Sequence, residues 1–298
     1  MDCTTVGPAG NSEGLRAPRV RAPAGACDCH MHIFDPRFAP SAHWKKTPPV
    51  APVASYRQVQ ARLGTSRTVV VQPSTFGIDN ACLLDALATF GEQARGVAVI
   101  EPEIDDAQLQ RMHALGVRGV RVNFVTEQSW GPTTLERLRH TADRVAPLGW
   151  HVQVFMTADQ IVEASPVLES LPTPLVIDHL GRMPQPLGVA HPGFRAVCRL
   201  LEQGRTYVKL SGPAMGTQVG PPSYADNSKV ARGYVLAAPD RVVWGSDWPH
   251  TTETEKPDDA DLLDLLLDWA PDEATRLKIF IHNPRDLYGF PQPDPITT

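Results

Sequence analysis

The sequence lacks the features that would direct a protein to nucleic acid or to a membrane. The formal net charge is −5, and lysine and arginine form no block that could track a phosphate backbone. No stretch of membrane-spanning length is free of charge or proline, and the first residues contain no continuous apolar segment of a secretory signal. We therefore expect no nucleic-acid partner, no membrane partner and a cytoplasmic location.

Cysteine is also scarce. The five cysteines are an odd number at irregular spacings, which does not suggest a disulfide framework and fits a reduced protein. Residues 1–24 are rich in glycine, proline, alanine and arginine without periodicity, so we expect a flexible N-terminal arm. Residues 25–298 show no break in composition and predict one domain, because barrel domains of roughly 250 residues are common.

From residue 25 onward, short runs rich in β-branched residues alternate with longer amphipathic segments. The short runs lack strict polar alternation, which is typical of strands buried on both faces of a parallel sheet. Strands are predicted over residues 26–34, 68–72, 96–100, 119–123, 151–155, 175–178, 207–210 and 241–244. Helices are predicted over residues 55–63, 80–90, 105–115, 133–145, 158–168, 194–202 and 259–269.

This alternation predicts an α/β fold, a single (β/α)8 TIM barrel. The alternative is an open, doubly wound sheet. A sheet of that kind that binds a nucleotide normally has a glycine-rich turn after its first strand. The first predicted strand is followed here by HMHIFDP, so the barrel is favoured.

The strongest functional signal is the pair His30 and His32 at the end of the first predicted strand. Side chains alternate across a strand, so both imidazoles are expected to face the barrel mouth, while Cys27 and Cys29 face the other way. Two imidazoles so placed can share one metal ion or one substrate oxygen.

Two further residues follow the sixth and eighth predicted strands, His179 in DHLGR and Asp247 in WGSDWPH. Each has an ordinary explanation by itself, because an exposed histidine and a turn aspartate are common. Together with His30 and His32, however, they all fall at the carboxyl ends of strands, where barrel enzymes place their chemistry. We therefore predict a catalytic group of His30, His32, His179 and Asp247.

Other residues near strand ends are predicted to contact substrate. Arg121 has an equally good alternative, a salt bridge to a neighbouring helix, and Trp248 has one in ordinary packing. The predicted substrate contacts are Gln72, Ser74, Arg121, Asn123, Phe155, Ser211, Trp248 and His250.

The segments CDCHMHIFDP, IDHLGR and WGSDWPH resemble the amidohydrolase superfamily of TIM-barrel hydrolases. Within it, the chain resembles the branch of 2-pyrone-4,6-dicarboxylate lactonase, galactarolactone isomerase and sulfomuconolactone hydrolase. The resemblance runs from about Gly25 to Tyr288 and includes VVVQPSTFGIDN, GVRGVRVNF, WHVQVF and HNPRDLYGF. It implies a small-molecule lactone as substrate, Asp247 as the general base, and histidines that polarise the carbonyl directly or through a metal.

The residues agree with that chemistry. A lactone is a cyclic ester, so its hydrolysis needs an activated water and stabilisation of charge on the carbonyl oxygen. No Gly-x-Ser-x-Gly segment indicates a serine esterase, and the fourth strand offers no lysine to bridge two metals. We expect either no cofactor or one divalent metal, with zinc favoured, on His30, His32, His179 and Asp247, and no organic cofactor.

Two departures bear on the substrate. Residues 211–217 contain no arginine, and the fifth strand ends in Phe155-Met156 where the pyrone enzyme has a tyrosine. A less anionic lactone, such as a sugar-acid lactone, is therefore supported at least as well as the pyrone dicarboxylate. A metal-dependent decarboxylase of aromatic or muconic acids, a lactone isomerase and a non-catalytic binding protein are the alternatives. The oligomeric state is expected to be a monomer or a small homo-oligomer.

Overall fold

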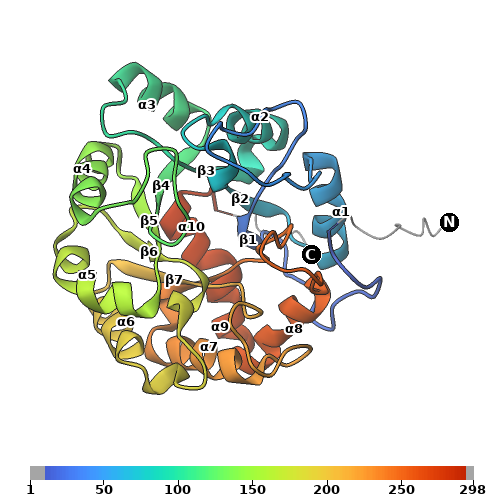
Figure 1. Cartoon of the computed structure of the whole chain (residues 1–298). Helices are drawn as coiled ribbons and strands as arrows, with labels where there is room; N and C mark the ends of the chain where they lie inside the picture. The colour runs from blue at the N-terminus through green and yellow to red at the C-terminus, as the bar shows by residue number, and fades with distance from the viewer. Residues whose placement is uncertain (1–10, 293–298) are drawn as a thin grey trace.

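The computed structural model describes residues 11–292, in which eight parallel strands form one sheet in chain order. Figure 1 looks into the ring that these strands form, and the helices surround the ring on its outside. The (β/α)8 prediction is confirmed, and the open doubly wound alternative is wrong. The strands are β1 Cys27–Met31, β2 Arg67–Val71, β3 Ala94–Ala98, β4 Val117–Asn123, β5 His151–Phe155, β6 Leu175–Ile177, β7 Thr206–Leu210 and β8 Val242–Trp244.

The helices pack their apolar residues on the outer face of the strands. All seven predicted helices are present, and α7 was missed because Asn227, Ser228 and Gly233 are weak helix formers. The main helices are α1 Val53–Leu63, α2 Ala81–Phe90, α3 Asp106–Ala114, α4 Leu135–Val145, α5 Ala158–Ser170, α6 Pro192–Glu202, α7 Ala225–Ala237 and α8 Asp259–Trp269. The short helices α9 Glu273–Leu277 and α10 Asn283–Tyr288 end the chain's described part.

A bulge in β1 corrects one prediction about the strand faces. The pairing of β1 with β2 shifts register between Asp28 and Met31, so strict alternation fails there. Cys27 and Cys29 therefore pack in the same apolar cluster as Val69, Val71, Val97 and Val243 of neighbouring strands, which is the barrel interior. Both cysteines and both histidines are consequently on the inner side of β1.

The described part of the N-terminal segment runs along two helices. Residues 12–22 form no helix or strand, but they are attached to α1 and α8. The main-chain nitrogen of Arg19 donates to Asp264 Oδ1 over 2.7 Å, and Arg62 Nε donates to the main-chain oxygen of Arg16 over 2.9 Å. Asp264 of α8 and Arg62 of α1 supply these partners. The predicted arm's first ten residues lie outside the described residues.

None of the helices in residues 11–292 is long and apolar enough to cross a membrane. The four cysteines in these residues, Cys27, Cys29, Cys82 and Cys198, are all unpaired, which agrees with the predicted lack of a disulfide framework.

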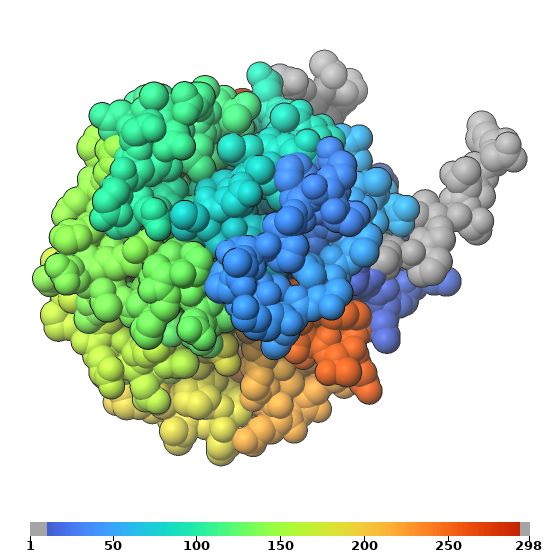
Figure 2. Space-filling view, turned by 45° about the horizontal axis from the view of Figure 1, so that its top comes forward, coloured from blue at the N-terminus to red at the C-terminus, as the bar shows by residue number. Residues whose placement is uncertain are grey.

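A loop of residues 35–50 crosses the mouth of the barrel. Its ends are joined because Phe34 and Ala51 exchange two main-chain hydrogen bonds of 2.9 Å. The nitrogen of Ser41 donates to the main-chain oxygen of Thr75 over 2.9 Å, which holds the loop against the segment after β2. Figure 2 shows this blue loop beside the green segment near residue 130 on the same face. We call residues 35–50 the mouth loop.

Candidate active site

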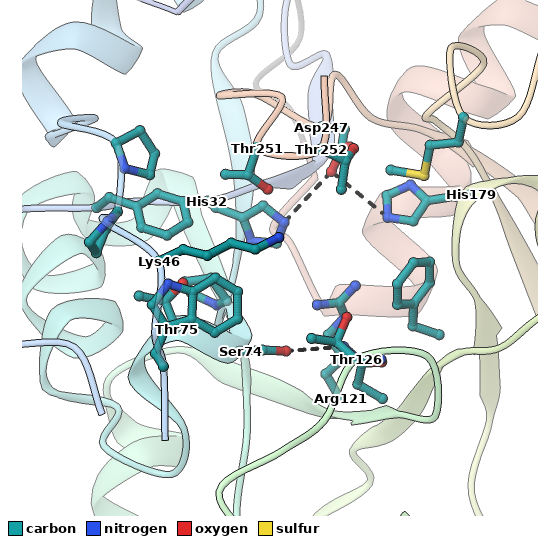
Figure 3. Close-up of a pocket in the computed structure, with 18 of the residues that line it drawn as sticks. His32, Lys46, Ser74, Thr75, Arg121, Thr126, His179, Asp247, Thr251 and Thr252 are labelled. Carbon is teal, nitrogen blue, oxygen red and sulfur yellow. Dashed lines mark hydrogen bonds and ion pairs between the residues drawn. The ribbon is translucent and has the colours of Figure 1, made fainter. Parts of the chain in front are cut away.

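Four predicted residues come together at the carboxyl ends of β1, β6 and β8. Asp247 Oδ1 lies 3.6 Å from Nε2 of His30, 3.6 Å from Nε2 of His32 and 3.8 Å from Nε2 of His179. The Nε2 atoms of His30 and His32 are 3.3 Å apart. All four residues are buried, and Figure 3 shows Asp247 between His32 and His179. One carboxylate oxygen is thus shared by three imidazole nitrogens.

The backbone around β8 brings Asp247 to this position. Gly245 allows the close approach, because a Cβ atom there would lie 2.6 Å from Cβ of His30. Asp247 and His179 both have positive φ angles, 65° and 47°, in a region that residues other than glycine seldom occupy. Such conformations persist where the surrounding structure holds them, and they are common at functional sites.

In His32 and His179, the other ring nitrogen, Nδ1, also has a defined partner. His32 Nδ1 lies 2.8 Å from the main-chain oxygen of Val71 in β2. His179 Nδ1 lies 2.9 Å from Oγ of Ser211, the residue after β7. These contacts orient each ring so that its Nε2 atom faces Asp247.

A charged cluster lies beneath His30, and sequence reasoning missed its central member. Lys209 of β7 is fully buried, and its Nζ atom is 3.1 Å from Nδ1 of His30. Asp178 lies beside them, with Oδ1 4.0 Å from Lys209 Nζ, and Oδ2 accepts a hydrogen bond of 3.0 Å from Arg121 Nε. A lysine inside the apolar run Tyr207-Val208-Lys209-Leu210 was the available signal, because a buried lysine needs a partner.

Burial and charge determine the protonation of this site. Burial lowers the pKa of Lys209 to about 8, so its ammonium form still predominates at neutral pH. Burial also lowers the pKa values of His30 and His179. For Asp247, burial opposes ionisation, but the nearby His179, His32 and His30 outweigh it and lower the pKa of the carboxyl group. Asp247 is therefore a carboxylate beside the neutral imidazoles of His30 and His179 at neutral pH.

A second buried carboxyl group supports the β1–β8 junction. Asp28 accepts hydrogen bonds from the nitrogen of Ser246 over 2.9 Å, from Ser246 Oγ over 2.6 Å and from Tyr56 Oη over 2.9 Å. It also accepts from the main-chain nitrogen of His30 over 3.1 Å. Burial raises the pKa of Asp28 to about 6, despite these donors. Asp28 thus holds both the main chain of His30 and Ser246, the residue before Asp247.

The pocket above Asp247 has a volume of about 150 Å³, which suits a single-ring ligand. Of the predicted substrate contacts, Ser74, Arg121, Asn123 and Phe155 line it. Asn123 Nδ2 donates to Ser74 Oγ over 3.0 Å, and the guanidinium of Arg121 lies 5.0 Å from the ring centre of Phe155. Arg121 also forms a salt bridge, as the alternative interpretation predicted, but its partner is Asp178 and not a residue of a helix.

Four predicted substrate contacts lie outside the pocket lining. Gln72 donates to the main-chain oxygens of Gly77 and Asp79, and Ser211 contacts His179. The Trp248 ring is fully buried 5.4 Å from that of Tyr56, as the packing alternative proposed, and His250 Nε2 lies 3.0 Å from Asp259 Oδ1. These side chains contact the protein around the pocket, because the chain bends after β2, β7 and β8 and turns them away from the pocket itself.

Three pocket-lining features were not predicted from sequence, and two of them come from the mouth loop. Lys46 lines the pocket, and Figure 3 shows its side chain reaching in from the loop. Within residues 11–292 its ammonium has no hydrogen bond or ion pair. Trp44 also lines the pocket, and its buried Nε1 atom has no hydrogen-bond partner among the described residues. The third is a set of hydroxyl groups, from Thr47, Thr75, Thr126, Thr251 and Thr252.

The spacing of three of the four predicted donor atoms fits one metal ion. Zinc–nitrogen bonds of roughly 2.0–2.1 Å in a tetrahedron place ligands about 3.3–3.4 Å apart. The separations among Asp247 Oδ1 and the Nε2 atoms of His30 and His32 are 3.3–3.6 Å. The ammonium of Lys209 behind His30 opposes this, because a metal ion would add a second positive charge to one imidazole.

Comparison with known proteins identifies the family of this chain and agrees with its fold. The amidohydrolase family matches residues 27–290, so the chain belongs to that family. It is 38% identical to the 2-pyrone-4,6-dicarboxylate hydrolase of Comamonas testosteroni, over 91% of this chain and 92% of the relative. It is 35% identical to the 4-sulfomuconolactone hydrolase of Hydrogenophaga intermedia, over 91% of both chains.

The solved structure of an Agrobacterium tumefaciens protein in its apo form is similar throughout. Its TM-score is 0.86 and its sequence identity is 28%, over 94% of this chain and 99% of that one. The predicted superfamily and branch are confirmed by these relatives, which act on lactones by their names.

Proposed function

We propose that this protein hydrolyses a lactone that carries one carboxylate, with Asp247 as the general base. The observation that carries the proposal is the ionised Asp247 at the base of a small pocket, in contact with three histidines. Relatives 35% and 38% identical are named as lactone hydrolases, which supports the same reaction class.

The chemistry follows from the groups present. Asp247 takes a proton from water, and the resulting hydroxide adds to the ring carbonyl carbon. His179, whose Nδ1 contacts Ser211, presents Nε2 at the pocket and stabilises the charge on the carbonyl oxygen. The bond from that carbon to the ring oxygen then breaks, and the ring oxygen takes the proton back from Asp247. The product is a hydroxy acid, or its keto form where the leaving oxygen is an enolate.

The pocket's charge favours a substrate with one anionic group. Arg121 shares its charge with Asp178, whereas Lys46 has no such partner among the described residues. We propose that Lys46 and the indole N–H of Trp44 bind the carboxylate substituent. The hydroxyl groups of Thr47, Thr75 and the other threonines suit a hydroxylated ring, so a sugar-acid lactone is favoured over a pyrone dicarboxylate.

We further propose that any metal the protein retains is a single divalent ion, with zinc favoured. His30, His32 and Asp247 would hold it, with His179 as the proposed fourth ligand, and it would supply a Lewis acid for the carbonyl oxygen. The roles given above to Asp247, Lys46 and Trp44 are the same with or without the ion.

The test is a pH-indicator screen of sugar-acid lactones, muconolactones and the pyrone dicarboxylate with wild-type protein and Asp247→Asn. We expect acid release from a monocarboxylated lactone with wild type and its loss in the variant. Product without acid release would indicate an isomerase, and release of carbon dioxide from a muconic or aromatic acid would indicate a decarboxylase. No turnover of any lactone, with tight binding retained, would contradict the proposal and favour a binding protein.

A further inference from the structure

The hydrogen bonds around His32 determine which of its nitrogens carries a proton. Its Nδ1 atom lies 2.8 Å from the main-chain oxygen of Val71, and a carbonyl oxygen can only accept. His32 Nδ1 must therefore carry hydrogen. In the neutral ring, His32 Nε2 is then an unprotonated acceptor.

This assignment passes directly to His30. The Nε2 atoms of His30 and His32 lie 3.3 Å apart in a hydrogen bond. With a neutral His32 ring, His30 Nε2 is the donor of this contact and carries the hydrogen. In the neutral ring His30 Nδ1 is then an acceptor, so it needs a donor on the barrel side.

Lys209 is that donor. Its Nζ atom lies 3.1 Å from His30 Nδ1, and an ammonium group can only donate. The competing group is Asp178, whose Oδ1 lies 3.3 Å from the same nitrogen. Among the described residues, however, Asp178 Oδ1 makes no hydrogen bond, and its other oxygen is held by Arg121 over 3.0 Å. The contact with Lys209 thus specifies the Nε2–H tautomer of His30, and a neutral His32 ring accepts that hydrogen.

We infer that Lys209 is a positioning residue that holds His30 as the Nε2–H tautomer and thereby lowers the affinity of the four-residue site for a divalent metal ion. A metal ion and a proton cannot both occupy His30 Nε2. Binding of an ion requires the ring proton to move to Nδ1 and a new hydrogen bond from Nδ1 to Asp178. It also places a second cation near the fully buried Lys209.

The same arrangement gives His30 a role that differs from that of His179. His30 is fully buried and lies outside the pocket lining, so its N–H serves His32 and lies close to Asp247. It helps to keep Asp247 ionised and His32 in place and does not contact the substrate. These statements concern the resting protein and need no turnover, so they stand apart from the proposed lactone hydrolysis.

The tautomer can be measured directly in the wild-type, metal-free protein. Long-range proton–nitrogen NMR spectra of ¹⁵N-histidine-labelled protein distinguish Nδ1–H from Nε2–H rings, and His30→Gln and His32→Gln identify the two signals. We expect His30 protonated at Nε2 and His32 protonated at Nδ1. A His30 ring protonated at Nδ1 would overturn the inference.

The effect on metal affinity is tested with Lys209→Met, which keeps the length of the side chain but removes the ammonium. Zinc affinity is measured at one pH by competition with a chromophoric chelator. We expect binding about 10- to 100-fold tighter than wild type, the range known for changes behind metal-binding histidines. The control Lys278→Met removes a lysine that pairs with Asp240 on the surface, and its affinity should equal that of wild type. Unchanged or weaker zinc binding in folded Lys209→Met would refute the inference. If this variant fails to fold, the NMR measurement on wild type still decides it.

Discussion

The main-chain nitrogen of Asp247 donates to the main-chain oxygen of His30 over 2.8 Å. Two residues beyond His30 and one beyond Asp247, the nitrogen of His32 donates to the oxygen of Trp248, also over 2.8 Å. These bonds join the first and last strands of the barrel at the site itself. The proposed base is therefore joined directly to the histidines at the end of β1, although more than two hundred residues separate them in the chain.

Replacing Asp247 by asparagine should reduce kcat/KM by about 10²- to 10⁴-fold, because the general base is lost. Asparagine tolerates the positive φ of 65° about as well as aspartate, so the backbone should not change. Steady-state kinetics on the best lactone and a circular dichroism spectrum make the comparison. Activity within a few-fold of wild type would show that another group is the base.

Replacing Lys46 by methionine should raise KM for a carboxylated lactone about three- to tenfold and leave kcat nearly unchanged. The effect is modest because Lys46 is exposed and water screens its charge. Lys45→Met is the matched control, since the neighbouring ammonium donates to the main-chain oxygen of Ala42 instead. Equal KM values for both variants and wild type would remove Lys46 from the binding site.

Removing the hydroxyl group of Ser211 with alanine should lower kcat about two- to tenfold with little change in KM. The hydroxyl contacts His179 Nδ1 over 2.9 Å, and losing one such hydrogen bond costs about 0.5–1.5 kcal/mol. Ser165→Ala, which removes a buried hydroxyl that donates to the main-chain oxygen of Ile161 within α5, serves as the control for general destabilisation. A rise in KM alone would mean that Ser211 acts on substrate binding rather than on the orientation of His179.

The raised pKa of Asp28 predicts that the stability of the protein depends on pH. Its pKa is about 6 in the folded protein and 3.8 in the reference state, so the folded state binds this proton more tightly. Its favourable contribution is complete below about pH 4 and is lost as the pH rises through 6. The unfolding free energy of wild type relative to Asp28→Asn should therefore fall by up to roughly 3 kcal/mol between pH 4 and pH 7. Urea titrations at several pH values measure it, and a difference that rises with pH would contradict the assignment.

Treatment with a chelator should leave most of the lactone hydrolysis intact. The reason is the hydrogen bond from Lys209 to His30 Nδ1, which leaves a proton where a metal would bind. Elemental analysis before and after treatment must accompany the rate measurement. If zinc and activity are lost together and return together, the site functions with a metal.

Much of the fold was predictable because it depends on local patterns. Short β-branched runs between amphipathic segments specify parallel strands and outer helices, and these patterns need no knowledge of distant contacts. His30, His32, His179 and Asp247 were found for a related reason. Each follows a strand, and the carboxyl ends of parallel strands in a barrel must meet at one rim.

The residues that were missed or misplaced depend on contacts between segments remote in sequence. A bulge in β1 placed Cys29 and His30 on the same inner side, which alternation does not predict. Gln72, Trp248 and His250 follow strands as Asp247 does, but local bends turn them toward the scaffold. Lys46 belongs to a loop without periodicity, so only the closure of the mouth loop through Phe34 and Ala51 brings it to the pocket.

The sequence by itself determined the barrel, its rim and the chemical types of the four groups on that rim, because periodicity and strand-end position are local properties. Only the tertiary structure decided how these groups act together. It set Lys209 beneath His30, Val71 behind His32 and Ser211 behind His179. Hydrogen-bond partners, and hence tautomers and charge, depend on distances of a few tenths of an ångström between different strands, and no pattern along the chain encodes them.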